Sequence, residues 1–279
     1  MVSRDHPLVT RERVLVTVKA YPKPSNKYDE LVCTAGITED GSWVRIYPIP
    51  LQELEFSKFD WIELNLKNRS DDFRPETYEP ANQPQIEDLE VVDHIETGPD
   101  RNWTARKEVC CQDTYYSLDQ LIEDSKPPAL VSLATFKPDK IVDLKVEEGD
   151  REWKEEWKKQ RRAPDLFDSE EDRRRELIRK LPYEFRYQFR DKEGKESEMK
   201  IIDWEIGALY FNCLERAEGD EEVAVEKVRD KYLGDFTDRD THLFLGTTKQ
   251  YHGVAPNPFI VIGVFYPPEV KQGRMFADI

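Results

Sequence analysis

The sequence predicts an α+β protein, in which a small N-terminal β-barrel is joined through a charged helical connector to a hairpin, two-helix, hairpin unit. Residues 1–146 hold short strands separated by polar turns, a pattern typical of small barrels. Residues 181–279 hold two helical patterns between strands. In residues 147–180, 23 of 34 residues are charged, and few core contacts can cross such a segment. We therefore predict a β-rich domain (1–146), a connector (147–180) and an α+β domain (181–279).

The first predicted elements are a strand at 13–18 and a hairpin at 31–48. In the strand, valines at alternate positions predict one fully buried face. In the hairpin, Asp40-Gly41 is the dipeptide preferred in two-residue turns, because both central residues there need positive φ. Pairing outward from a two-residue turn sets Gly36 opposite Arg45. The core face of the hairpin then consists of Cys33, Ala35, Ile37, Val44 and Ile46.

The rest of the N-terminal half adds more short strands and a helix. Ile62, Leu64 and Leu66 alternate within 61–66 and predict a strand with these side chains inward, and residues 86–96 add one more strand. Ser117 is a favoured helix N-cap residue before an apolar helical pattern. Two strands, at 130–136 and 141–146, then close this half of the protein.

The C-terminal half begins with LPYEFRYQFR (181–190), which alternates four aromatic side chains with polar ones. Such a face needs a cover, and a helix capped by Asp203 follows at once, so we interpret the aromatic stripe as core. Asp220 begins a second helix. Strands at 241–248 and 259–266 complete the unit, and the pattern leaves open whether they rejoin the first barrel.

Charge and composition exclude several classes of protein. The net charge of −16 excludes a simple polycation that grips nucleic acid by bulk charge, but ten acidic residues lie within 71–100, so a local basic patch remains compatible with it. The four cysteines form no CxxC pair, which argues against a zinc site or a disulfide framework. No apolar run is long enough to span a bilayer or to act as a signal peptide, so we expect a cytoplasmic protein without membrane contact.

Trp43, Arg45 and Tyr47 form the most informative constellation, because two aromatic rings flank a cation on the second strand of the hairpin. Single-strand binders on barrel sheets stack bases on such rings while cations meet phosphate. On that interpretation, Trp43→Ala weakens single-strand binding by ~1–3 kcal/mol. The alternative is that both rings pack beneath a helix or the 71–100 loop, with Arg45 paired to an acidic residue.

Further basic and aromatic residues extend this predicted nucleic-acid surface. The loop 249–258 lies between two strands, and functional residues often occupy loops held by rigid strands. The additional candidates, which could equally be ordinary surface residues, are Lys19, Lys23, Lys27, Lys249, Tyr251 and His252.

The string ELVCTAGITEDGSWVRIYPI (30–49) resembles the opening of uncharacterised prokaryotic proteins with a dual OB-fold region, in which a segment ending in AGI and a GxWVR-type strand recur. The similarity covers about twenty residues. It implies an OB-like barrel at the N-terminus. It also implies a place among accessory proteins of prokaryotic defence or mobile-element systems, where such regions are thought to contact nucleic acid. The family supplies no catalytic residue.

Enzymatic patterns are mostly missing from the sequence. It holds no phosphate-binding glycine loop, no nucleophile elbow and no paired histidines at metal-ligand spacing, so we expect neither a cofactor nor a metal. Glu198-Met199-Lys200, preceded by Asp191, matches the carboxylate and lysine set of a magnesium-dependent nuclease. The fit is poor, because Asp191 and Glu198 flank a short turn in a simple hairpin.

Three functions therefore stay open. The first is a non-catalytic, nucleic-acid-binding accessory protein that prefers single strands. The second is a protein-interaction module, whose acidic loop and connector, including Trp153 and Trp157, bind a basic partner. The third is the magnesium-dependent nuclease. We adopt the first as the prediction.

Overall fold

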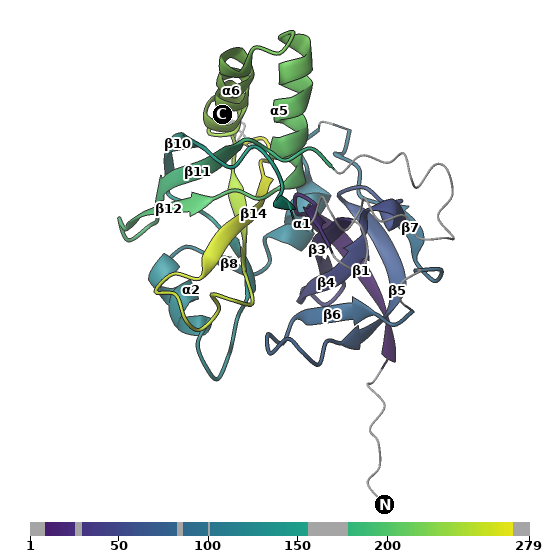
Figure 1. Ribbon diagram of the computed structural model, residues 1–279. Coiled ribbons are helices and arrows are strands. Elements are labelled where there is room, and N and C mark those ends of the chain that lie inside the picture. The colour runs from purple at the N-terminus through teal and green to yellow at the C-terminus, as the bar shows by residue number, and fades with distance from the viewer. Residues whose placement is uncertain (1–8, 26–29, 83–85, 100, 156–177, 270–279) are drawn as a thin grey trace, which may run out of the picture.

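The computed structural model describes residues 9–25, 30–82, 86–99, 101–155 and 178–269, which form two β-rich units lying side by side (Figure 1). The first unit is a closed five-stranded barrel, and the second combines two sheets with most of the helical residues. The α+β class predicted from the sequence is confirmed. Lys27 and most of the predicted connector, including Trp157, lie outside the described residues.

Five strands close the N-terminal barrel. They are β1 (Val9–Lys19), β3 (Glu30–Thr38), β4 (Trp43–Pro50), β5 (Asp60–Asn68) and β6 (Thr77–Pro80). Around the barrel the order is β1, β3, β4, β6, β5, and β5 pairs back to β1. The β4–β6 pairing is parallel and the other four pairings are antiparallel. This closed barrel is consistent with the OB-like barrel expected from the sequence.

Three small elements complete the first unit. The two-residue strand β2 (Lys23–Pro24) pairs with β3, and the 3-10 helix η1 (Leu51–Glu53) follows β4. Strand β7 (Glu90–His94) pairs with β5 at the open edge of the sheet, within the predicted range 86–96. Inside the barrel, Val14, Ile46 and Leu64 belong to one buried cluster. The inward direction predicted for the apolar residues of β5 is therefore confirmed.

The hairpin between β3 and β4 exists, but its predicted register is wrong by one residue. Ile37 pairs with Trp43 and Ala35 with Arg45, because the loop holds three residues and Thr38 N donates a 2.9 Å hydrogen bond to Ser42 O. Of the two loop residues Asp40 and Gly41, only Gly41 has positive φ, at 87°, as a three-residue loop requires. A slip of one residue exchanges the faces of a strand relative to its partner.

This register puts apolar residues on both faces of the hairpin. Val44 and Ile46 point into the barrel, whereas Ala35 and Ile37 point outward beside Trp43. The single core face predicted from the sequence is therefore wrong, and the outer face of the barrel is a second buried surface. The same holds for β1, in which Val14 and Val16 lie inside and Leu15 and Val18 lie outside.

The second unit contains a three-stranded and a four-stranded sheet. Its elements are α1 (Thr104–Cys110) at the junction, β8 (Thr114–Tyr115), α2 (Leu118–Asp124), β9 (Leu133–Phe136), β10 (Lys140–Glu148), β11 (Tyr183–Arg190), β12 (Glu196–Lys200), α5 (Trp204–Arg216), α6 (Glu221–Arg229), the π-helical turn η2 (Asp230–Asp235), β13 (His242–Thr247) and β14 (Phe259–Phe265). The hairpin β11–β12, the two helices and the hairpin β13–β14 occur in the predicted order.

Strands β9 and β10 belong to this second unit. β9 pairs with β13, and β10 pairs with β11, so neither strand closes the N-terminal barrel as predicted. The predicted domain boundary at residue 146 falls inside β10. The reason is that alternation predicts a strand but not its partner, which here lies up to about a hundred residues further along the chain. Likewise β13 and β14 pair with each other and do not rejoin the barrel.

The two units share one strand order, although the sequence shows no repeat. In the second unit β9 pairs with β13, β13 with β14, and β12 with β11, which pairs with β10. A parallel bridge between Ile201 and Val261 joins the end of β12 to β14. With β9 and β10 taken as one interrupted first strand, the order and the parallel pairing of the third strand with the fifth match those of the barrel. The short strand β8 adds a second parallel pairing, to β9, that the barrel lacks.

Local capping signals were predicted correctly. The side chains of Ser117, Asp203 and Asp220 each accept a hydrogen bond from a backbone N–H in the first turn of α2, α5 and α6. Helix α5 covers the aromatic stripe of β11, with the Tyr210 ring 5.6 Å from that of Tyr183 between centroids. The interpretation of this stripe as core is confirmed.

The units are held together along the end of β1. Ala20 forms an antiparallel bridge with Asp203, and Tyr21 N donates a 2.8 Å hydrogen bond to Ile202 O. The outer face of the barrel packs against β13 and β14 through Phe244 and Phe265. The relative position of the units is therefore fixed by backbone hydrogen bonds and a shared apolar core.

Among the described residues, no helix is both long enough and apolar enough to cross a membrane.

His242, at the start of β13, predicts a pH dependence of stability. Its Nδ1–H donates to Asp240 O at 2.8 Å, and burial lowers the pKa of the imidazole to about 4. Since the unfolded chain protonates near pH 6.5, the unfolded state binds more protons between pH 6.5 and 4, and stability falls as pH falls through that range. We expect a loss of about 3 kcal/mol in the free energy of unfolding across this window.

Urea unfolding at several pH values measures this effect. The comparison variant His242→Asn keeps a donor toward Asp240 O and removes the titration. Burial also lowers the pKa of His252, so the difference between the two profiles, rather than either one alone, isolates His242. Superimposable profiles for the two proteins between pH 6.5 and 4.5 would contradict the prediction.

Candidate functional site

A cavity of about 290 Å³ lies between the outer face of β3 and β4 and the second unit. The barrel contributes side chains from β1 to β4, from the residues after β1, and from the loop between β5 and β6. The second unit contributes β9, the residues after β12, the strands β13 and β14, and the loop between them. Its lining residues are Val18, Ala20, Tyr21, Lys23, Leu31, Cys33, Ala35, Arg45, Tyr47, Arg74, Leu133, Ile202, Thr247, Thr248, Lys249, Ile260 and Ile262. Its walls are mainly apolar, with cations at one side.

Arg45 is the central polar group of the cavity and is only 3% exposed. Its guanidinium donates to the hydroxyls of Thr77 and Ser132 at 3.0 and 2.9 Å, and to the carbonyl oxygens of Ser132 and Thr247 at 3.1 and 3.4 Å. All four acceptors are neutral, and in the described part of the chain no carboxylate pairs with it directly. Burial lowers the pKa of Arg45 to about 10, so the side chain stays charged at neutral pH.

The nearest acidic group reaches Arg45 through one hydroxyl. Ser132 Oγ donates to Glu76 Oε2 at 2.8 Å while it accepts from Arg45. The second buried cation, Arg74, pairs with Asp72 at 2.5 Å. Burial alone would raise the pKa of Asp72, but the hydrogen bonds from Arg74 lower it. Arg74 is therefore neutralised locally, whereas Arg45 is compensated only at a distance.

The rim carries two exposed lysines and two tyrosines. Lys23 and Lys249 are exposed, and Lys249 Nζ lies 3.5 Å from the carboxylate of Asp71. Tyr47 is half-buried beneath the guanidinium of Arg69, which lies 5.0 Å from the ring centroid, and burial raises the pKa of its hydroxyl. These residues surround the opening with positive charge and aromatic surface.

Two buried polar atoms, one in the cavity lining and one outside it, lack hydrogen-bond partners among the described residues. Thr248 Oγ1, in the cavity lining, is buried and has no partner among the described residues, and the same is true of His252 Nε2. The other ring nitrogen of His252 lies 3.1 Å from Thr247 Oγ1, so the imidazole supports the wall behind Arg45. A buried polar atom without a partner costs about 1–3 kcal/mol, and a ligand could supply the missing hydrogen bond.

The structure brings four of the predicted site residues together. Lys23, Arg45, Tyr47 and Lys249 line the one cavity, although they come from three separate parts of the chain. The predicted exposure of Arg45 is wrong, because the second unit covers the barrel face that bears it.

The other predicted residues lie elsewhere. Trp43 packs edge-on against Phe244, with ring centroids 5.4 Å apart, in the interface between the units rather than over a ligand. Lys19 points to the opposite side of β1, where its ammonium lies over the ring of Phe56. Tyr251 is 52% exposed but does not line the cavity, and His252 is 2% exposed, so the predicted accessible loop is partly buried.

Sequence reasoning missed the residues that the second unit and the 69–76 loop contribute. Thr247, Thr248 and Ile262 carry no local signal, because they meet the barrel only through folding. Arg74 did carry one, since it is the single basic residue among ten acidic ones in 71–100. Such a cation within an acidic stretch indicates a structural or binding role.

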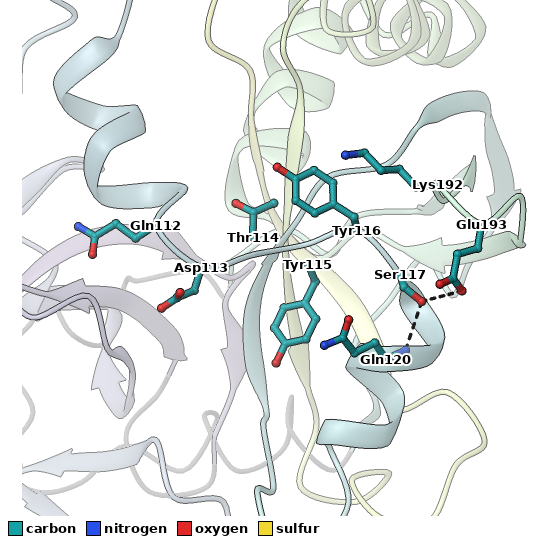
Figure 2. A pocket seen from close by; sticks show the side chains of 9 residues that line it. All are labelled: Gln112, Asp113, Thr114, Tyr115, Tyr116, Ser117, Gln120, Lys192 and Glu193. Carbon is teal, nitrogen blue, oxygen red and sulfur yellow. Dashed lines mark hydrogen bonds between the residues drawn. The ribbon is translucent and has the colours of Figure 1, made fainter.

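Two larger hollows are more open. One of them, of about 640 Å³, is lined by residues within 112–120 and by Lys192 and Glu193. Figure 2 shows these side chains, with Ser117 Oγ donating to Glu193. The Lys192 ammonium lies 3.5 Å from the ring centroid of Tyr116. The side chains that line this hollow are mostly polar. The other, of about 630 Å³, holds Lys58 bound to the buried Asp203. In the first hollow Lys192 and Glu193 already have partners, and in the second Lys58 does.

The nuclease residues do not converge. Asp191 is buried and accepts hydrogen bonds from the backbone N–H groups of Leu118, Glu193 and Lys195. Glu198 on β12 pairs with Lys145 instead. In the described ranges of the chain, no group of three or more His, Cys, Asp or Glu side chains is placed to hold a metal ion. The geometry therefore gives the magnesium mechanism no support.

Two sequence families match the chain. The family described as Domain of unknown function (DUF8757) matches residues 112–279, and that described as Domain of unknown function (DUF8758) matches residues 10–112. Since the first match covers more than half of the chain, the protein belongs to the DUF8757 family. None of the curated proteins compared with the chain matches it. The two matches meet at residue 112, between α1 and β8, which agrees with the strand pairing.

Proposed function

We propose that this protein binds single-stranded nucleic acid, without catalysis, at the cavity between its two units. The observation that carries the proposal is the convergence of Lys23, Arg45, Tyr47 and Lys249 on one cavity. OB-fold proteins bind oligonucleotides on the face of their second and third strands and on the flanking loops. In this barrel those strands are β3 and β4, which form one wall of the cavity.

We also propose that both units are OB-like barrels, as the resemblance of residues 30–49 implies. The shared strand order and the parallel pairing of the third strand with the fifth in each unit support this. Membership of a prokaryotic defence or mobile-element system stays a prediction from that resemblance alone.

The overall negative charge limits how the strand is bound. With a net charge of −16, the protein repels a polyanion except where cations are concentrated, so binding depends on the rim lysines and is sensitive to salt. Single strands are favoured over duplexes because a cavity of this size admits a base only when it is unstacked.

A double variant, Lys23→Glu/Lys249→Glu, is expected to weaken single-strand binding at least tenfold. Each lost phosphate contact also lowers the slope of log affinity against log salt by about 0.7. Fluorescence anisotropy of labelled single-stranded DNA, single-stranded RNA and duplex DNA across a salt series measures both quantities. The matched control is Lys140→Glu, which reverses an exposed charge outside the cavity. Equal losses in the control and the double variant would contradict the assignment.

The second candidate, a protein-interaction module, has one favourable observation. Edge strand β7 is exposed along its whole length, with Val91 at 47% and Val92 at 41%, between acidic neighbours Glu90 and Asp93. Such an edge can accept a strand from a basic partner. If no nucleic acid binds in the anisotropy series, this candidate replaces the first.

A further inference from the structure

We propose that the cavity receives one unstacked base of a bound single strand, with the neighbouring phosphate at the rim cations, so that its ligand is a single nucleotide unit. This inference rests on the proposed function and adds what the cavity recognises. It differs from the stacking of successive bases on an open sheet, which the sequence alone suggested.

The cover over the barrel face decides between these two modes. Leu133, Ile202 and Ile262 of the second unit enclose the face of β3 and β4, and the remaining space is about 290 Å³. That volume is at the lower end of the range for small-ligand pockets, about 300–1,000 Å³. A run of stacked bases does not fit into it, whereas one ring system does. A strand that uses the cavity therefore has to turn a base out of its stack.

The walls match the chemistry of a base. Apolar side chains such as Val18, Ala35 and Ile260 line the cavity and would contact the faces of a base, and polar side chains line it as well. Thr248 Oγ1 is buried without a hydrogen-bond partner among the described residues, and it can donate to or accept from an edge of the base. Four of the five N–H groups of Arg45 already donate to Thr77, Ser132 and Thr247, so within the described residues its Nε–H is the donor left for a carbonyl oxygen or ring nitrogen of the base.

Charge favours a nucleotide over an uncharged ring. Arg45 has only neutral direct partners, and the exposed Lys23 and Lys249 line the same cavity. A phosphate beside these cations would compensate their positive charge. Asp71 compensates only one of them, Lys249, whose Nζ lies 3.5 Å from its carboxylate. The same cations give little reason to bind a neutral or positively charged small molecule.

The first experiment separates the base from the backbone. We compare a labelled strand made entirely of abasic sugar-phosphate units with the same strand carrying one thymine at its centre. Both have the same charge, so the rim contacts the two strands alike. The single base is expected to tighten binding about tenfold, within the range for burying one base against protein. Affinities equal within twofold would overturn the inference.

Cys33 allows the cavity to be filled in the native protein. Its thiol lies in the lining and is not fully buried, so N-ethylmaleimide can add to it and occupy the space without refolding the chain. After alkylation, the advantage of the one-base strand is expected to vanish. The variant Cys33→Ser, treated with the same reagent, is expected to keep the full advantage, which controls for reaction at Cys111 and Cys213. Retention of the advantage after complete alkylation of Cys33 would overturn the inference.

Failure of this inference is distinguishable from failure of the proposed function. If abasic and one-base strands bind equally and with the same salt dependence, the protein binds the backbone and only the inserted base is wrong. If no strand binds, abasic or otherwise, the proposed function is wrong, and the inference falls with it.

Discussion

Gly36→Ala is expected to lower the free energy of unfolding by about 3 kcal/mol or more, because β3 and β1 approach too closely for any side chain at this position. A Cβ atom on Gly36 would lie 2.3 Å from Leu15 O and 2.5 Å from Val14 Cγ1. The first of these contacts is with backbone, which cannot rotate away as a side-chain tip can. Relief therefore requires the two central barrel strands to separate, with loss of hydrogen bonds between them.

Chemical unfolding of the variant and the natural protein measures this loss. The matched control is Gly234→Ala, since a Cβ atom there has no neighbour within 4 Å. Because Gly234 lies in the helical turn η2, the control is expected to leave stability unchanged or to raise it by up to about 1 kcal/mol. A Gly36→Ala protein as stable as the control would show that the barrel can relax around the added methyl group.

Trp43→Ala is expected to destabilise the protein by about 3 kcal/mol, the lower end of the range for truncating a buried aromatic side chain. The Trp43 ring meets Phe244 edge-on across the boundary between the units, and it is only partly exposed. Because the ring does not line the cavity, single-strand affinity per folded molecule is expected to change less than threefold. We therefore expect Trp43→Ala to lower the stability of the protein, rather than the single-strand affinity as the sequence predicted.

Two further variants make this distinction sharp. Trp43→Phe keeps an aromatic contact with Phe244 and is expected to recover most of the lost stability. Tyr47→Ala removes a ring from the cavity rim and is expected to weaken binding about tenfold, as for loss of one stacking contact. Anisotropy under conditions where calorimetry shows each protein to be folded separates the two effects. Equal loss of single-strand affinity in Trp43→Ala and Tyr47→Ala would show that Trp43 does belong to the binding surface.

Features that depend on neighbouring residues could be predicted from the sequence. The caps Ser117, Asp203 and Asp220 act on N–H groups within three residues, and the aromatic alternation of β11 needs only the period of a strand. The predicted register of the β3–β4 hairpin was wrong because the length of its loop was wrong. Asp40-Gly41 suits both a two-residue and a three-residue loop, since Gly41 takes positive φ in either, and the choice exchanges which residues of β3 face Arg45.

Features that depend on distant residues could not be predicted. Arg45 bonds to Ser132 and Thr247, which lie 87 and 202 positions further along the chain. No periodicity in residues 30–50 reveals that a second unit will cover this strand. The types of residue chosen for the site were informative, because cations and rings on the barrel face do line the cavity. The solvent accessibility of these residues could not be predicted, because it depends on how the two units pack together.

The two-sided construction of the cavity makes ligand binding and the docking of the units a single equilibrium. Arg45 belongs to one unit and Thr247 to the other, so a fragment containing either unit alone lacks half of the site. By mass action, a ligand at a hundred times its dissociation constant adds about 2.7 kcal/mol to the stability of the docked state. The reverse also holds, since whatever loosens the contact between Ala20 and Asp203 also lowers ligand affinity at the cavity. The free energy with which the two units dock therefore contributes directly to the free energy of ligand binding.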